Sequence, residues 1–291
     1  MLQVARLAPQ QLGESRDLVA GFLRSRLAPD GGFLNRGGAS DLYYTVFGLE
    51  GLVALQEPLP SETVTPYLAR FHDGADLDFV HLSSLARCWA TLSRDQAGVP
   101  ARRLLAHLET FRSRDGGYAQ APDAECGSVY AAFLALGAYE DLRAALPEPD
   151  RLLDSLGALR ARDGGYANRP GDPHGITTVT AAAVLLRRVL GGAIDPHLGM
   201  WLLDRCHASG GFVASPAAPI PDLLSTATAL HALAALHVPL AGVAEPCLDF
   251  VDSLWTNRGG FFGSWADDTL DCEYTYYGLL ALGHLTAATP L

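Results

Sequence analysis

The sequence contains no lysine: all 21 basic residues are arginine, a composition typical of GC-rich bacterial genomes, and 32 acidic residues outnumber them. The formal charge of −11 repels phosphate backbones and anionic lipid heads, and no basic run offsets it. Without lysine, a Schiff-base nucleophile and a lysine phosphate clamp are both excluded. We therefore expect no nucleic-acid partner.

Cysteine is scarce as well, with five residues scattered along the chain and no CxxC pair. This spacing argues against a disulfide framework and against a cysteine-rich zinc site. No apolar run approaches the roughly eighteen uninterrupted residues of a membrane-spanning helix, and the first residues do not resemble a secretory signal. We expect a cytoplasmic protein with no membrane span.

A repeated turn is what the sequence has in abundance: two glycines, then an aromatic residue, a loop and an apolar segment. Successive copies are 85, 48, 46 and 49 residues apart, so the first interval has room for two units. The segment His72-Asp73-Gly74 lies near its middle and marks a degenerate copy. A period of this size indicates a repeat architecture, here of six units. The complete copies are Gly31-Gly32-Phe33, Gly116-Gly117-Tyr118, Gly164-Gly165-Tyr166, Gly210-Gly211-Phe212 and Gly259-Gly260-Phe261.

Each unit has an amphipathic segment before the turn and a nearly apolar segment after it. Apolar residues at three- and four-residue spacing predict an outer helix, and continuous apolar character predicts an inner helix buried on most sides. Glycine ends the first helix because it adopts the left-handed conformation without a Cβ penalty. The outer helices are expected at 16–26, 64–71, 101–112, 150–161, 196–206 and 245–255, and the inner helices at 46–55, 82–92, 129–136, 179–190, 224–236 and 276–285.

Six such hairpins bury the most apolar surface when they close into a ring. We predict an all-α fold, an (α/α)6 toroid that forms one domain over residues 1–291. The first residues of the inner helices would meet at one end of the ring, here called the mouth. Free backbone amides at these helix starts favour anions.

Polar residues at the mouth are the candidates for chemistry, although Asp, Ser and Thr at a helix start are more often caps. Carboxylates that share one mouth raise each other's pKa and can supply a general acid. The candidate acids are Asp267, Asp271 and Glu273. Among the histidines, His81 and His174 are best placed for function.

The glycine turns and the segment Asp-Leu-Tyr-Tyr-Thr-Val-Phe-Gly-Leu at 41–49 resemble the prenyltransferase and squalene-cyclase repeat family over nearly the whole chain. The closest likeness is to the β subunits of protein prenyltransferases. In that branch a His-Gly pair contacts the diphosphate of the substrate, and His174-Gly175 matches it. The resemblance implies an isoprenoid ligand, with Mg²⁺ present only alongside a diphosphate.

The zinc ligands of the transferases are only partly present. Their Asp-x-Cys pattern keeps its aspartate as Asp222, but Leu224 replaces the thiolate, and Tyr274 stands where the zinc histidine belongs. Zinc is therefore not expected, and neither is any other cofactor. Asp78 and His81 match the Asp-x-x-His pattern one unit too early, which leaves an off-register metal site with Asp41 or Glu273 as an alternative.

The cyclase branch of the family uses an Asp-x-Asp-Asp-Thr acid motif. Trp265-Ala266-Asp267-Asp268-Thr269 keeps its last three residues, so this likeness implies that Asp267 is a proton donor.

Aromatic residues of the inner helices would line a central apolar cavity. Such a wall holds a polyprenyl chain by area burial, and its π faces can stabilise a carbocation. We hypothesise an enzyme acting on an isoprenoid. The alternatives are a catalytically lapsed homologue that binds a prenyl group, a partner protein or a second copy, and a different reaction on the same fold. The expected substrate-binding residues are His174, Tyr44, Tyr130, Tyr274, Trp89 and Asp222.

Overall fold

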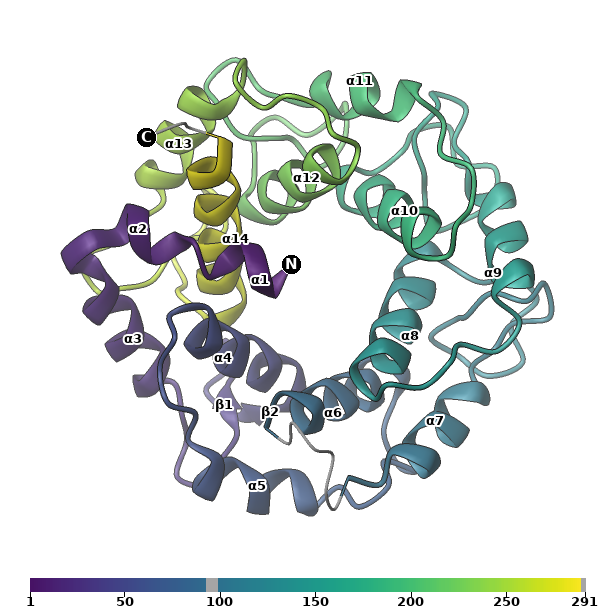
Figure 1. The fold of residues 1–291 in the computed structure, drawn as a ribbon, viewed down its shortest axis with the longest axis horizontal. Helices are drawn as coiled ribbons and strands as arrows, with labels where there is room; N and C mark the ends of the chain where they lie inside the picture. The colour runs from purple at the N-terminus through teal and green to yellow at the C-terminus, as the bar shows by residue number, and fades with distance from the viewer. Residues whose placement is uncertain (93–98, 289–291) are drawn as a thin grey trace.

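Six pairs of helices follow one another around a closed ring (Figure 1) in a computed structural model that describes residues 1–92 and 99–288. Each inner helix packs against the next, and α14 returns to α4. The prediction of an (α/α)6 toroid is confirmed. The inner helices are α4 (Leu42–Ala54), α6 (Phe79–Leu92), α8 (Val129–Asp141), α10 (Thr177–Val189), α12 (Leu223–Ala235) and α14 (Cys272–Ala288).

The outer helices lie around this inner ring (Figure 1). All of them fall within the amphipathic segments that the sequence predicts, give or take a residue at the start, except that α5 begins three residues early. They are α3 (Arg16–Ser25), α5 (Ser61–Ala69), α7 (Ala101–Glu109), α9 (Pro149–Ser155) with the 3-10 turn η2 (Leu156–Leu159), α11 (His197–Leu203) and α13 (Ala244–Ser253). Among the described residues, no helix is both long and apolar enough to cross a bilayer.

The inner helices begin up to four residues earlier than the apolar pattern predicts. The first turn of α4, for example, starts at Leu42 and that of α14 at Cys272, because tyrosine and acidic side chains occupy these turns and do not count as apolar. Just before α4, the antiparallel strands β1 (Phe33–Leu34) and β2 (Ser40–Asp41) form a small hairpin. The additional first turns of α4 and α14 carry side chains of the mouth.

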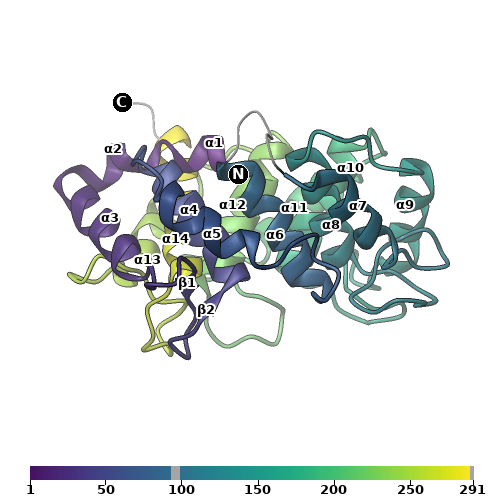
Figure 2. The same ribbon diagram turned by 90° about the horizontal axis from the view of Figure 1, so that it is seen from below.

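Two short helices, α1 (Leu2–Ala5) and α2 (Ala8–Leu12), precede the ring, followed by the 3-10 turn η1 (Gly13–Ser15). The repeat pattern does not predict them, because they are too short to show a helical period. Helix α1 packs on α14, where a Cβ at Gly283 would overlap the carbonyl oxygen of Val4. Figure 2 shows α1 and α2 on the opposite face of the ring from the strands before α4.

The aromatic residue of each glycine turn is a buried plug, as the sequence predicts. Phe33, Tyr118 and Phe212 are 0% exposed, and the other two are at most 2% exposed. Each aromatic residue pairs with the residue six positions earlier in an antiparallel bridge or strand contact, so every turn is a tight hairpin. In three units the N–H of the aromatic residue donates to a threonine hydroxyl of its own inner helix at 2.9 Å: Phe33 to Thr45, Tyr166 to Thr180 and Phe212 to Thr226.

In three of the five complete turns, the first glycine approaches the backbone of the next unit closely. These glycines have φ between 81° and 98°, which favours glycine. A Cβ at Gly31 or Gly210 would overlap a backbone carbonyl oxygen of the following outer helix. The last turn does the same with the first outer helix, since a Cβ at Gly259 would overlap the carbonyl oxygen of Leu18 in α3. The same kind of contact therefore closes the ring.

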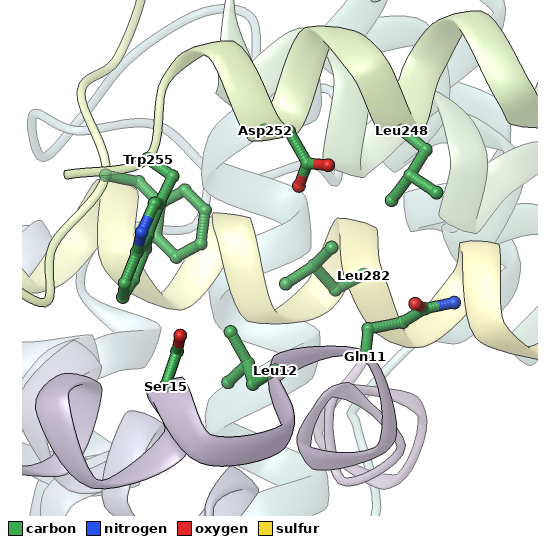
Figure 3. Close-up of a pocket in the computed structure, with 8 residues that line it drawn as sticks. Gln11, Leu12, Ser15, Leu248, Asp252, Trp255 and Leu282 are labelled. Atoms are coloured by element: carbon green, nitrogen blue, oxygen red, sulfur yellow. The ribbon is translucent and has the colours of Figure 1, made fainter. Parts of the chain in front are cut away.

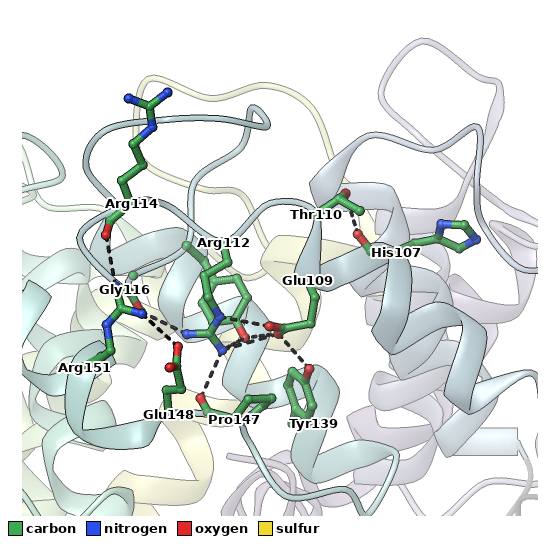
Figure 4. A network of polar contacts seen from close by, with 12 residues as sticks. His107, Glu109, Thr110, Arg112, Arg114, Gly116, Tyr139, Pro147, Glu148 and Arg151 are labelled. Carbon is green, nitrogen blue, oxygen red and sulfur yellow. Dashed lines mark hydrogen bonds and ion pairs between the residues drawn. The ribbon is translucent and has the colours of Figure 1, made fainter.

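A buried polar cluster ties an outer helix, its turn and its inner helix together (Figure 4). Arg112 Nε donates to Glu109 at 2.9 Å, the hydroxyl of Tyr139 donates to the same carboxylate at 2.7 Å, and the hydroxyl of Tyr118 donates as well. The guanidinium of Arg112 lies 4.5 Å from the centre of the Tyr118 ring and also donates to the carbonyl of Pro147 at 3.0 Å. Burial alone would raise the pKa of Glu109, but these donors hold it below its usual range. The cluster is structural.

Replacing Gly259 by alanine should destabilise the protein by about 2–4 kcal/mol, because the new Cβ meets backbone at a left-handed φ. The matched control is Gly21→Ala in α3, the outer helix that Gly259 contacts, where a Cβ would meet nothing within 4 Å. This control should stabilise the helix by up to about 1 kcal/mol. The free energy of unfolding in urea measures both, and equal values for the two variants would contradict the account of ring closure.

Candidate active site

Three carboxylates of the mouth cap the starts of inner helices. Asp41 accepts hydrogen bonds from the N–H groups of Tyr43 and Tyr44 at the start of α4. Asp222 caps α12 through the N–H of Ser225 at 2.7 Å, and Asp271 accepts from the N–H of Tyr274 at 2.8 Å. Such N-caps satisfy free amides at the helix start. Their capping role explains why these acids are present, and any chemistry must come from further contacts.

Arg36, which the sequence does not single out, joins two of the candidate acids. It lies in the loop between β1 and β2 and donates to Asp271 at 2.6 Å and to Asp267 at 2.7 Å. Its guanidinium also lies 5.1 Å from the centre of the Tyr274 ring. These partners are more than 230 residues away in the sequence, since the pair spans the junction between the first and last units. No local pattern marks such a partner.

The environment of Asp267 disfavours the proton-donor role that the cyclase likeness implies. Burial would raise the pKa of Asp267, but the hydrogen bond and charge of Arg36 lower it below its usual range. The carboxylate also accepts from the N–H groups of Thr269 at 3.1 Å and Gly263 at 3.2 Å. An ionised, fully bonded carboxylate has no proton to give. In contrast, burial raises the pKa of the fully buried Asp271 despite its bond to Arg36.

Glu273 is the carboxyl group best suited to hold a proton. It lies in the first turn of α14 and accepts a hydrogen bond from the hydroxyl of Tyr43 at 2.6 Å. Burial raises the pKa of Glu273 to about 7, and the nearby charge of Asp271 adds to the shift. Burial and the charge of Glu273 also raise the pKa values of Tyr130 and Tyr277. A group that titrates near neutral pH can act as an acid or a base.

Aromatic rings continue from Glu273 into the ring of inner helices. Tyr43 contacts Phe47 with their ring centres 4.9 Å apart, and Phe47 lies 5.5 Å from Tyr277. Tyr44 stacks edge-on against Tyr43 at 5.6 Å. The half-buried Tyr43 and Tyr277 leave part of this aromatic wall accessible. Tyr43 is missed by the sequence reasoning, although its spacing of four residues from Phe47 places both on one helix face.

His81 lies between two carboxylates, as the off-register pattern suggests. Its Nδ1 is 2.7 Å from Asp78 and its Nε2 is 3.4 Å from Asp41. Burial alone would lower the pKa of His81, but the hydrogen bond with Asp41 has the larger effect and raises the pKa to about 9. Among the residues the structure describes, no group of three or more His, Cys, Asp or Glu side chains is arranged to hold a metal ion. The trio is therefore best described as an ion-paired imidazolium.

The glycine of the His174-Gly175 pair has a structural explanation. The N–H of Gly175 donates to Asp163 of the preceding turn at 3.0 Å, and a Cβ there would lie 2.7 Å from the Cα of Gly165. Gly127 makes the same kind of contact one unit earlier. The imidazole of His174 is 66% exposed and 3.9 Å from Asp163. Its binding role stays a prediction.

The remaining expected ligand residues differ in their surroundings. Tyr130 is half-buried at the mouth, and its N–H donates to Asn168 at 3.0 Å. Burial raises the pKa of Asp222, which has no cation beside it among the described residues. Trp89 is 9% exposed and belongs to the hydrophobic core, which disfavours the substrate contact expected of it.

The mouth is acidic as a whole. Two cationic groups of the mouth, Arg36 and His81, are both engaged by carboxylates. An anionic diphosphate would meet repulsion there rather than a basic clamp. The carboxyl groups are those of Asp41, Asp78, Asp222, Asp267, Asp271 and Glu273.

The fold agrees with comparisons to known proteins. Residues 10–75, 69–153 and 194–289 match the family described as the prenyltransferase alpha-alpha toroid domain, so the chain belongs to this family. No curated protein sequence matches the chain.

Solved structures share the ring at low sequence identity. The chain is similar to geranylgeranyltransferase-I from Candida albicans complexed with GGPP, at 15% identity and a TM-score of 0.59, over 74% of this chain and 73% of that one. The type II terpene cyclase MstE from Scytonema gives 16% identity and a TM-score of 0.63, over 96% and 99%. A glycosidase gives 14% identity and a TM-score of 0.59, over 99% of both chains. These likenesses show the fold alone.

Replacing Arg36 by methionine should destabilise the protein by about 2–3 kcal/mol, because it leaves the buried Asp271 unpaired. The control is Arg70→Met, which also removes an arginine that pairs with an aspartate and covers a tyrosine, but on the surface with Asp30 at 3.2 Å. That change should cost less than about 1 kcal/mol. The free energy of unfolding in urea is measured for both variants. An equal loss would show that Arg36 stabilises the fold no more than a surface ion pair does.

Replacing His81 by glutamine should remove a pH-dependent part of the stability. The folded-state pKa of His81 is above its ordinary value of 6.5, so its contribution is fully present below pH 6.5 and is lost as pH rises through about 9. Since the side chain is partly exposed, the contribution is at most about 1 kcal/mol.

The free energy of unfolding at pH 6.5 and pH 9.5 measures this difference against His197→Gln, an exposed histidine outside any ion pair in the described chain. The native protein and His197→Gln should lose more stability than His81→Gln over this interval. An identical loss in all three proteins would place His81 outside the ion-pair account.

Proposed function

We propose that the protein is an enzyme that acts on an isoprenoid at the mouth of its ring, with Glu273 as the general acid or base. The observation that carries the proposal is the half-buried Glu273 carboxyl, which is hydrogen-bonded to Tyr43 at 2.6 Å and has a pKa raised to about 7. A neutral carboxylic acid at physiological pH can protonate an alkene, and its conjugate base can remove a proton from a carbocation.

The aromatic wall beside Glu273 supports this chemistry. The faces of Tyr43, Phe47 and Tyr277 can stabilise a positive charge that develops on the substrate. Because the cations of the mouth are already paired, we favour a reaction begun by proton transfer over one begun by loss of a diphosphate. A prenyl diphosphate remains the first substrate to test, with its diphosphate on the solvent side near His174.

A second candidate is hydrolysis of a glycosidic bond. A mouth rich in carboxyl groups offers the acid and base pair that glycosidases use. The glycosidase that shares the fold over 99% of both chains favours testing it. The pairing of Asp267 with Arg36 leaves Asp271 and Glu273 as the acids for either reaction. A lapsed homologue that only binds an isoprenoid or a partner protein is the third outcome.

Glu273→Gln should lower the turnover by at least about 100-fold, because the amide keeps the shape of the side chain but cannot transfer a proton. The control is Glu245→Gln in the first turn of the outer helix α13, which should keep full activity. Farnesyl and geranylgeranyl diphosphates, the corresponding prenyl alcohols and aryl glycosides are the substrates, with products followed by mass.

The pH dependence gives a second measure of the same group. If Glu273 acts as an acid, activity should fall as pH rises through about 7, where its proton is lost. Full activity of Glu273→Gln on a prenyl substrate would refute the assigned role. Turnover of glycosides alone would establish the second candidate, and binding of a prenyl group without turnover would establish the lapsed homologue.

A further inference from the structure

A small pocket lies away from the mouth, where the segment before the first unit meets the sixth unit (Figure 3). It has a volume of about 150 Å³ and is formed by α2 and η1 on one side, α13 on the other and α14 behind. Helix α2 lies on the opposite face of the ring from the strands of the mouth (Figure 2). A ligand of this pocket would therefore not share the site of Glu273.

Three polar side chains of the pocket have no partner in the described part of the chain. The Asp252 carboxylate, the Ser15 hydroxyl and the Gln11 amide all lie at its edge and form no hydrogen bond or ion pair with the described residues. Burial, followed by the like charge of Asp249, raises the pKa of Asp252, as expected for a carboxylate that lacks a cation. Asp252 and Gln11 are exposed and Ser15 is half-buried, so the three groups lie at the open rim of the pocket, where a ligand can reach them.

The rest of the pocket is apolar. Leu12, Leu248 and Leu282 face one another across it, and Trp255 stands at one end (Figure 3). The Trp255 ring is held by Phe261, with their centres 5.1 Å apart, so the indole is a fixed wall. A cavity of about this volume holds one six-membered ring.

We propose that this pocket binds a small organic cation, an amine whose ammonium group pairs with Asp252 and whose cyclic apolar body lies between Trp255 and the leucines. The carboxylate selects against anions, and the acidic surface of the whole protein attracts cations. The aromatic wall beside the carboxylate adds attraction for the same charge.

Benzylammonium is the probe, titrated by calorimetry and by ligand-observed NMR against benzyl alcohol and benzoate, which have a similar body but a neutral and a negative head. Benzylammonium should bind about tenfold more tightly than benzyl alcohol, since a hydrogen-bonded charge pair is worth about this much. Benzoate should bind most weakly. Equal affinities for benzylammonium and benzyl alcohol would overturn the proposal.

Asp252→Asn should weaken benzylammonium binding about tenfold and remove the preference for the amine. Asp249→Asn removes the same charge from the same helix without lining the pocket, and should keep the affinity within about twofold. Leu248→Trp should fill the pocket and abolish binding of all probes. Thermal unfolding confirms that each variant is folded.

A lysine side chain of another protein carries the same ammonium group, although a second copy of this lysine-free chain cannot supply one. Nα-acetyl-lysine methylamide tests this source. We expect it to bind more weakly than benzylammonium, because its straight chain leaves the ring-shaped space unfilled. Tighter binding of the lysine probe, or no effect of Asp252→Asn, would refute a site for free cyclic amines.

Discussion

The close approach of a turn glycine to the backbone of the next outer helix is the contact on which the ring depends. At Gly31, Gly210 and Gly259 the space that a side chain would take is filled by a carbonyl oxygen of the neighbouring unit. The aromatic residue after each glycine pair is then buried under its own unit. Because the last turn meets α3 in the same way, the repeat closes on itself and brings the first and last units together at the mouth.

The junction between the first and last units places three carboxyl groups in different environments. Arg36 crosses from the first unit to the last, lowers the pKa of Asp267 and binds the buried Asp271. Glu273, two residues further along α14, has a phenol for its partner instead of a cation, and burial raises its pKa to about 7. Arg36 thus pairs with Asp267 and Asp271 and leaves Glu273 without an ion-pair partner among the described residues.

The fold can be predicted from the sequence because its signals are local: glycine pairs mark the turns, and apolar periodicity separates inner from outer helices. The degenerate unit at Gly74 follows from the spacing alone and is confirmed by α5 and α6. The site is harder to predict, because its contacts join residues that are distant in the sequence: Arg36 and Asp271 are separated by 235 positions, and Tyr43 and Glu273 by 230. Family motifs point to Asp267 and His174, but no motif encodes the ion pair of Asp267 or the solvent exposure of His174, which set their surroundings apart from those of Glu273.

The account predicts that the Glu273 carboxyl, whose hydrogen-bond partner is the Tyr43 hydroxyl, titrates near neutral pH. Selective carboxyl ¹³C labelling of glutamate, with assignment of the Glu273 signal by comparison with Glu273→Gln, measures its pKa directly in the folded protein. A midpoint at about pH 7 supports the account. A midpoint close to the ordinary value of 4.5 would show an ionised carboxylate and contradict the assignment of Glu273 as the acid or base.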